Sequence, residues 1–153
     1  MMAYETFFRT IAAERGLDWR VLAQEAWRES RMNALAVGAA GDMGLMQILP
    51  ATWNEWAPKL GILDPYDPES NIRVAAVILA YLRDVLAGLG RPELCWMLTA
   101  YNWGIGNVQR LLKSGGTWSQ VPPQRQAYAN DIILAAEADA LAEQMGLATP
   151  VYG

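Results

Sequence analysis

The sequence predicts a mostly α-helical single domain with a small irregular hairpin or loop region near residues 33–48. Hydrophobic residues make up 53% of the 153 residues and charged residues 18%, a balance typical of one globular core. Apolar residues recur at helical spacing along most of the chain, and glycines and prolines separate these stretches. No repeat, low-complexity tract or linker divides the sequence, so we expect one domain over residues 1–153.

The first part of the chain predicts three helices around the irregular segment. A first helix ends at Gly16, and Asp18 can cap a second helix that reaches about Ser30. Residues 33–48 are small and rich in glycine, so we expect a loop with a short irregular hairpin. Pro50 suits the first turn of the short helix that follows.

The second part of the chain predicts a long helix and three further ones. The long helix follows the turn "DPYDPESN", carries one apolar stripe, and ends at Gly88 and Gly90. The next helix contains "PELCWMLTAYN", and Gly104 and Gly106 break the chain before "NVQRLL". A last helix occupies about residues 124–145.

Net charge and two scarce residue types exclude several classes of protein. The formal net charge of −4 and the sequence pI of about 4.8 argue against a nucleic-acid partner, since such proteins depend on Lys and Arg at phosphates. The chain has no histidine, which excludes a His-based triad and any His-containing metal site. Cys95, the single cysteine, lies in an apolar run and is interpreted as a core residue. We expect no metal and no cofactor.

The N-terminal segment does not have the composition of a signal peptide. It carries Glu5 and Arg9 and has no long apolar core. The most apolar later stretch is interrupted by Arg73, Arg83 and Asp84, so we expect no membrane insertion. A substrate outside the cytoplasm would then require another agent to deliver the protein.

The seven tryptophans and six tyrosines are numerous for a chain of this length. Some of them must lie in the core. Sugar-binding clefts also use flat aromatic faces, which pack against the C–H side of a pyranose ring. Both interpretations stay open for the tryptophans, and the second would place at least two of them in a cleft.

Glu29 lies near the end of the second helix, beside its apolar stripe. At about 100° per residue, Glu29 is about 20° from Leu22 and about 40° from Glu25 around the helix. Apolar neighbours favour the neutral carboxyl, and a like charge one turn away acts in the same direction, so the pKa should rise. Such a group can serve as a general acid near neutral pH. The alternative is a solvated carboxylate paired with Arg28 or Arg31.

Four stretches of the sequence resemble motifs of the soluble lytic transglycosylases, a family of the lysozyme-like superfamily. The signature is "ESRMNALAVGAAGDMGLMQILPATW", and "DPYDPESNIRVAAVILAYL", "LTAYNWGIGNV" and "VPPQRQAYA" follow in the family's order. Together they span about residues 17–135. The resemblance implies an α+β lysozyme-like fold with a substrate cleft.

The resemblance also implies the site residues. Glu29 matches the catalytic acid/base, and the implied substrate-binding residues are Ser30, Met46, Gln47, Leu49, Tyr101, Asn102 and Tyr128. In the family the amide at Gln47 contacts sugar, Met46 and Leu49 form the cleft wall, and Tyr128 lies near its floor. The hydroxyl at Tyr101 typically hydrogen-bonds the catalytic carboxyl group.

The same residues also allow structural interpretations, and two family positions are altered. Gln47 could cap a turn, the Tyr101 hydroxyl could bond a backbone carbonyl, and Met46 and Leu49 could be core residues. The family often has a Ser that reaches the substrate's N-acetyl group where this chain has Gly38. Its usual Glu-Thr reads Gln124-Arg125 here.

The implied activity is cleavage of the β-1,4 bond between N-acetylmuramic acid and N-acetylglucosamine in peptidoglycan. One carboxyl group, Glu29, would act as acid and then base, with help from the substrate's acetamido group, and a 1,6-anhydro ring would form. One alternative is a hydrolase like goose-type lysozyme, with Asp42 positioning water, although a Gly-Asp turn explains Asp42 as well. Another alternative is a cell-wall glycan-binding protein without turnover.

The implied partner is a peptidoglycan glycan strand, bound by a monomer that acts on the bacterial cell wall in the periplasm or outside the cell. A compact domain without a signal peptide fits a phage lysin or a virion-associated protein, and a fragment of a larger protein would look the same.

Overall fold

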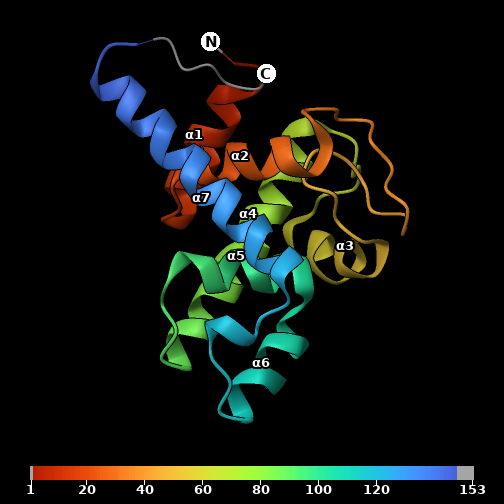
Figure 1. Cartoon of the computed structure of the whole chain (residues 1–153). Helices are drawn as coiled ribbons and strands as arrows, with labels where there is room; N and C mark the ends of the chain where they lie inside the picture. Colours follow the sequence, from red (N-terminus) through yellow and green to blue (C-terminus); the bar gives the residue numbers. More distant parts are fainter. Residues whose placement is uncertain (1, 148–153) are drawn as a thin grey trace.

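The computed structural model describes residues 2–147, and helices make up most of that range (Figure 1). The α-helices are α1 (Glu5–Arg15), α2 (Trp19–Ser30), α3 (Pro50–Trp56), α4 (Pro68–Gly88), α5 (Leu94–Trp103), α6 (Ile105–Lys113) and α7 (Pro123–Gln144). Two short 3-10 helices, η1 (Ala57–Leu60) and η2 (Trp118–Gln120), follow α3 and precede α7. The prediction of a mostly α-helical fold is confirmed.

The helix ends follow local signals in the sequence, with one exception. The Asp18 carboxylate accepts a hydrogen bond of 2.9 Å from the backbone N–H of Arg20, which confirms the predicted cap of α2. Gly16 ends α1 with a φ of 66°, a conformation that glycine adopts without strain. Gly88 is the last residue of α4, as predicted, and Gly104 precedes α6, whereas Gly106 lies in the first turn of α6 and does not break it.

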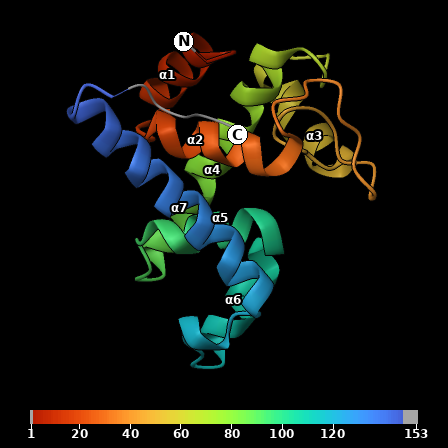
Figure 2. The ribbon, with the colours of Figure 1, turned by 45° about the horizontal axis from the view of Figure 1, so that its top comes forward.

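The core lies around α4, which carries the longest apolar stripe. Helices α1, α3 and α5 pack against α4, and α7 packs against both α2 and α5 (Figures 1 and 2). The largest fully buried apolar side chains include Phe8, Ile11, Leu22, Ile72, Leu79, Leu86, Leu98 and Ile132. Burial of each such side chain contributes about 1.5–3 kcal/mol to folding. The pairing of α2 with α7 places the end of α2 against the first turns of α7.

Residues 33–48 form the predicted irregular hairpin. Two isolated antiparallel bridges join Val37 to Met43 and Met43 to Ile48, without a continuous strand among the described residues. The segment returns on itself because Gly44 takes a φ of 77° and donates its N–H to the carbonyl of Ala36 at 2.8 Å. The hairpin therefore consists mainly of turns, as its small residues predicted.

Asn71, a completely buried residue of α4, attaches this hairpin to the core. Its Oδ1 accepts from the backbone N–H of Met46 at 2.8 Å, and its Nδ2 donates to the carbonyls of Met43 and Pro65 at 3.0 and 2.8 Å. A side chain at Gly44 would begin 2.4 Å from that Nδ2, so glycine is required there for space as well as for conformation. The two residues position the loop that carries Gln47.

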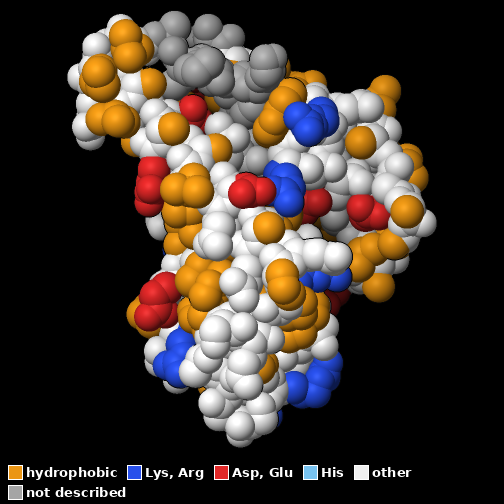
Figure 3. Space-filling model, viewed as in Figure 1, with side chains coloured by type: hydrophobic (Ala, Val, Ile, Leu, Met, Phe, Trp, Pro, Cys, Tyr) orange, Lys and Arg blue, Asp and Glu red, His pale blue; other side chains and the backbone are white. Residues whose placement is uncertain are grey.

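No helix in the described residues combines the length and apolarity needed to cross a membrane. Acidic and basic side chains are interspersed on the face seen in Figure 3, without a broad basic patch there. That distribution agrees with the net charge of −4.

Candidate active site

A cleft of about 610 Å³ lies between the hairpin, α3, α4 and the adjoining ends of α5 and α7. Its polar lining residues are Glu29, Asp42, Gln47, Thr52, Glu55, Tyr101, Asn102 and Arg125, and its aromatic ones are Trp56, Tyr81, Tyr101 and Trp103. Two tryptophans therefore line a cleft, which settles the interpretation that the aromatic content left open. Trp56 and Tyr81 form a tilted pair with ring centroids 5.0 Å apart, which keeps both faces in place.

Glu29 lies in the last turn of α2, half-buried at the wall of the cleft. Burial raises the pKa of its carboxyl group from 4.5 to about 7; a hydrogen bond from Tyr128 lowers the pKa, the charge of Asp42 raises it, and the charge of Arg28 lowers it. Near neutral pH the carboxyl group is thus divided between its acid and its base form. The predicted position beside the apolar stripe is confirmed.

Glu25, one turn earlier, is completely buried and shares the Tyr128 hydroxyl with Glu29. The Tyr128 oxygen lies 2.8 Å from Oε2 of Glu25 and 2.9 Å from Oε2 of Glu29. One phenolic hydrogen cannot make a full hydrogen bond to both carboxylates at once, so this arrangement favours a proton on one of the two carboxyl groups. Burial and the charge of Glu29 raise the pKa of Glu25 well above its ordinary value, although the Tyr128 bond lowers it. Burial therefore favours the neutral form of Glu25.

Two tyrosines approach the carboxyl groups, and their contacts differ from the prediction. The Tyr101 hydroxyl donates to the backbone carbonyl of Met46 at 2.7 Å, and Tyr128 contacts Glu29 instead. The expected Tyr101 bond to the catalytic carboxyl is therefore wrong. Burial and the charges of Glu25, Glu29 and Asp42 raise the pKa of the Tyr101 hydroxyl well above its ordinary value.

Met46 and Ser30 do not line the cleft, unlike the expected substrate contacts. Met46 is fully buried. Its backbone carbonyl accepts a hydrogen bond from the Tyr101 hydroxyl, and its backbone N–H donates to Oδ1 of Asn71. The Ser30 hydroxyl donates back along α2 to the carbonyl of Ala26 at 3.1 Å. The prediction of direct contact is corrected for Met46, whose side chain is fully buried, and the Ser30 contact stays a prediction.

Gln47 and Leu49 do line the cleft. Gln47 has a φ of 50°, and its Nε2 donates to the carbonyls of Gly44 and Ala36 at 2.9 and 3.2 Å. It therefore caps the hairpin turn while remaining part of the cleft wall. Leu49 is 46% exposed, so it is a surface of the cleft and not a core residue.

Asp42 and Gly38 depend on each other sterically. A Cβ at position 38 would lie 2.2 Å from Oδ2 of Asp42, far inside contact distance. The Asp42 carboxylate also accepts from the N–H of Ala40 at 3.2 Å, in the turn that the Gly-Asp pair predicted. Position 38, where the resembled family often has a serine, is thus a glycine here, and the Asp42 carboxylate fills the space that a side chain at position 38 would take.

Arg125 and Asn102 meet at the cleft. Nη1 of Arg125 donates to Oδ1 of Asn102 at 2.8 Å and to its backbone carbonyl at 3.2 Å. Arg125 was recognisable in the sequence only as half of an altered motif, and no local signal predicted its contact with Asn102. Trp56 and Tyr81 were likewise not assigned to the site, because helical spacing does not distinguish core from cleft.

Solved structures share this architecture. The chain aligns over 99% of its length with 26% of the lytic transglycosylase Slt of Pseudomonas aeruginosa, with a TM-score of 0.77 and 22% sequence identity. It aligns over its whole length with 26% of the 70 kDa soluble lytic transglycosylase of Escherichia coli, with a TM-score of 0.77 and 23% identity. The likeness shows that this chain shares the fold of the matching part of these two proteins.

Sequence comparison identifies the family. The family model described as the transglycosylase SLT domain matches residues 6–120, and the chain belongs to this family. Membrane-bound lytic murein transglycosylase F of Alcanivorax borkumensis is 34% identical over 146 residues, which cover 84% of this chain and 30% of that protein. The Yersinia pestis protein of the same name is 36% identical, over 73% of this chain and 23% of that protein. The chain therefore spans less than a third of the length of these relatives.

Proposed function

We propose that this chain is the catalytic domain of a peptidoglycan-cleaving lytic transglycosylase, with Glu29 as its single acid/base. The observation that carries the proposal is a half-buried carboxyl group with a pKa of about 7 in the wall of a long, aromatic-lined cleft. The relatives named above support the bacterial cell wall as the place of action, since their names identify them as murein transglycosylases. The bond cleaved is the β-1,4 bond between N-acetylmuramic acid and N-acetylglucosamine.

In the first step Glu29 acts as the general acid. The Tyr128 hydroxyl lies within hydrogen-bond distance of Oε2 of both Glu25 and Glu29, and when it donates to Glu29 it holds Oε2 of that carboxyl group in place. The proton of Glu29 then resides on Oε1, free for the glycosidic oxygen. If Glu25 were ionised, Tyr128 would turn its hydrogen to Glu25, and Glu29 would direct its proton inward. Glu25 is thus a positioning residue, and its neutral form leaves the Tyr128 hydrogen to Glu29.

In the second step Glu29 acts as the general base. The glycosidic bond breaks, the leaving sugar keeps the proton, and the substrate's acetamido oxygen stabilises the developing charge at the anomeric carbon. Glu29, now a carboxylate, accepts the proton of the muramyl 6-hydroxyl, whose oxygen bonds to that carbon. The 1,6-anhydro ring closes, Glu29 is protonated again, and no water is consumed.

Gln47, Leu49, Tyr101 and Asn102 would contact or shape the bound glycan, while Ser30, Met46 and Tyr128 hold the acid/base and the hairpin in place. Asp42 is committed to a turn by its bond to Ala40, which supports a role other than positioning of water. This mechanism requires only one carboxyl group, which distinguishes it from a hydrolysis that uses two carboxylates.

A digest of purified peptidoglycan, analysed by mass spectrometry, tests the proposal. Wild-type protein should release muropeptides lighter by one water than lysozyme products, and Glu29→Gln should release none while keeping its fold. Reducing-end products would instead identify a hydrolase and assign Asp42 a role, which Asp42→Asn would then remove. Intact glycan after both digests would mean a binding protein.

A further inference from the structure

Arg125 lines the cleft, and one edge of its guanidinium has no hydrogen-bond partner among the described residues. It lies in the first turn of α7, half-buried, and both of its hydrogen bonds use Nη1. Nε and Nη2 donate to no other residue in the described part of the chain, and no carboxylate there forms an ion pair with Arg125. By contrast, Arg28 and Arg73 are paired with Asp131 and Glu14. Asn102 therefore fixes one side of the guanidinium and leaves the other side available.

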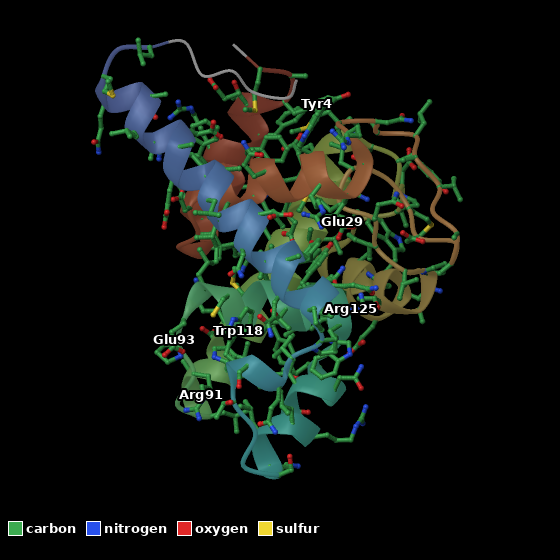
Figure 4. The ribbon with its side chains drawn as sticks, viewed as in Figure 1. Tyr4, Glu29, Arg91, Glu93, Trp118 and Arg125 are labelled. Carbon is green, nitrogen blue, oxygen red and sulfur yellow. The ribbon has the colours of Figure 1, made fainter. Side chains whose placement is uncertain are left out.

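Arg125 is also the one cation among the described residues that line the cleft, together with the acidic residues Glu29, Asp42 and Glu55. Figure 4 shows Arg125 and Glu29 on the side of the molecule that faces α3, and Arg91 near the opposite edge. Sugar hydroxyls and acetamido groups can be bound by amides and neutral hydroxyls. A planar guanidinium held in a fixed orientation is matched to a carboxylate, which it can bind through two parallel N–H bonds.

We propose that the free edge of Arg125 binds a carboxylate carried by the muramyl residue of the glycan, and so selects substrate by charge. This inference rests on the proposed function, which makes N-acetylmuramic acid part of the ligand. A muramyl residue without a peptide stem has a free lactyl carboxylate. A residue with a stem has that carboxylate in an amide bond, and its negative charge lies on the peptide. Chitin, a polymer of N-acetylglucosamine, has neither.

The proposal distinguishes two sources of the same chemistry. A lactyl carboxylate lies close to the muramyl ring whose glycosidic bond Glu29 cleaves. Peptide carboxylates lie further out along the stem. Arg125 lies at the cleft beside Asn102, which belongs to the same motif as Tyr101. Of the two carboxylates, the free lactyl carboxylate lies nearer to the bond that is cleaved. We therefore expect stem-free strands to be the preferred ligand.

Binding measurements in a Glu29→Gln background test this inference without turnover. The probes are a stem-free N-acetylglucosamine–N-acetylmuramic acid oligosaccharide, the same oligosaccharide with peptide stems, and a chitooligosaccharide of equal length. The variants are Arg125→Gln and Arg125→Lys. Arg91→Gln removes the same charge from a half-buried position that does not line the cleft, and is the matched control. Isothermal calorimetry measures the three dissociation constants, and thermal unfolding checks that each variant folds.

Arg125→Gln should weaken binding of the stem-free ligand about tenfold, the effect of one partly desolvated ion pair. Its affinity for the chitooligosaccharide should stay within about threefold, Arg125→Lys should restore part of the loss, and Arg91→Gln should match the parent. A loss confined to the stemmed ligand would assign the peptide carboxylate instead. An equal loss on all three ligands, or none, would overturn the proposal, because Arg125 would then only shape the cleft through Asn102.

These outcomes remain separate from those of the proposed function. If the parent binds none of the three ligands and the wild-type protein releases no muropeptides, the proposed function fails, and the Arg125 inference with it. If normal anhydro products form but the ligand ratios do not change with Arg125→Gln, only the charge selection is wrong.

Discussion

Glu29→Gln should stabilise the folded protein above neutral pH and leave its stability at pH 4 almost unchanged. Folding raises the pKa of this carboxyl group from 4.5 to about 7. Below pH 4.5 the group is neutral in the folded and unfolded states and contributes nothing. Between pH 4.5 and 7 the unfolded chain loses the proton and the folded one keeps it, so the cost grows with pH. Above pH 7 the folded protein carries the full cost of a partly buried anion.

The size of that cost follows from the shift. A change of about 2.5 pKa units corresponds to about 3 kcal/mol at 1.36 kcal/mol per unit. Glutamine has a similar shape, accepts the Tyr128 hydrogen bond and never ionises, so its variant should gain about this amount at pH 8. For a chain of this length, that gain raises the unfolding temperature by about 6–12 °C.

Urea unfolding of both proteins at pH 4, 6 and 8 measures the difference in unfolding free energy. Glu137→Gln, which alters an exposed carboxylate of α7, should change stability by less than about 0.5 kcal/mol at each pH. A Glu29→Gln difference that is equal at pH 4 and pH 8, or a less stable variant at pH 8, would refute the assignment of a raised pKa. The expected trade of stability for an active group is common at catalytic sites.

Three further changes have defined outcomes. Tyr128→Phe removes the hydrogen bond that lowers the pKa of Glu29, so the alkaline limb of the pH–rate profile should move to higher pH; a shift to lower pH would contradict the assigned donor. Glu25→Gln should keep the wild-type profile within about threefold in rate, because its amide donates to Tyr128 as a neutral carboxyl does, whereas a downward shift of the alkaline limb would mean that Glu25 is charged. Asn71→Ala removes three buried hydrogen bonds and should lower the unfolding free energy by about 3 kcal/mol or more in urea; a loss below about 1 kcal/mol would mean that the hairpin does not depend on it.

The helices and the position of Glu29 were predictable because both depend on local periodicity. Apolar spacing located every α-helix to within a few residues, and Asp18 caps α2 as predicted. The angle between Glu29 and Leu22 on α2 was sufficient to predict burial of the carboxyl group. Small residues in 33–48 predicted an irregular hairpin, because no periodic apolar face could form there.

The partners of these residues depend on tertiary packing, which local patterns do not contain. Whether Tyr101 or Tyr128 reaches Glu29 depends on how α5 and α7 meet α2, and the first expectation was wrong. Glu25 and Glu29 share the hydroxyl of Tyr128, which lies 103 and 99 residues further along the chain. The burial of Met46 likewise depends on the distant Asn71, whose amide holds the loop against α4.

The clearest test of the central claim, a single carboxyl group that closes a ring without water, is a digestion in oxygen-18-labelled water. Peptidoglycan cleaved by the wild-type protein should yield muramyl ends that carry no label and have the mass of the 1,6-anhydro form. A lysozyme digest in the same water supplies the labelled reference. Muramyl ends that carry one labelled oxygen would contradict the account, because water would then have attacked the anomeric carbon.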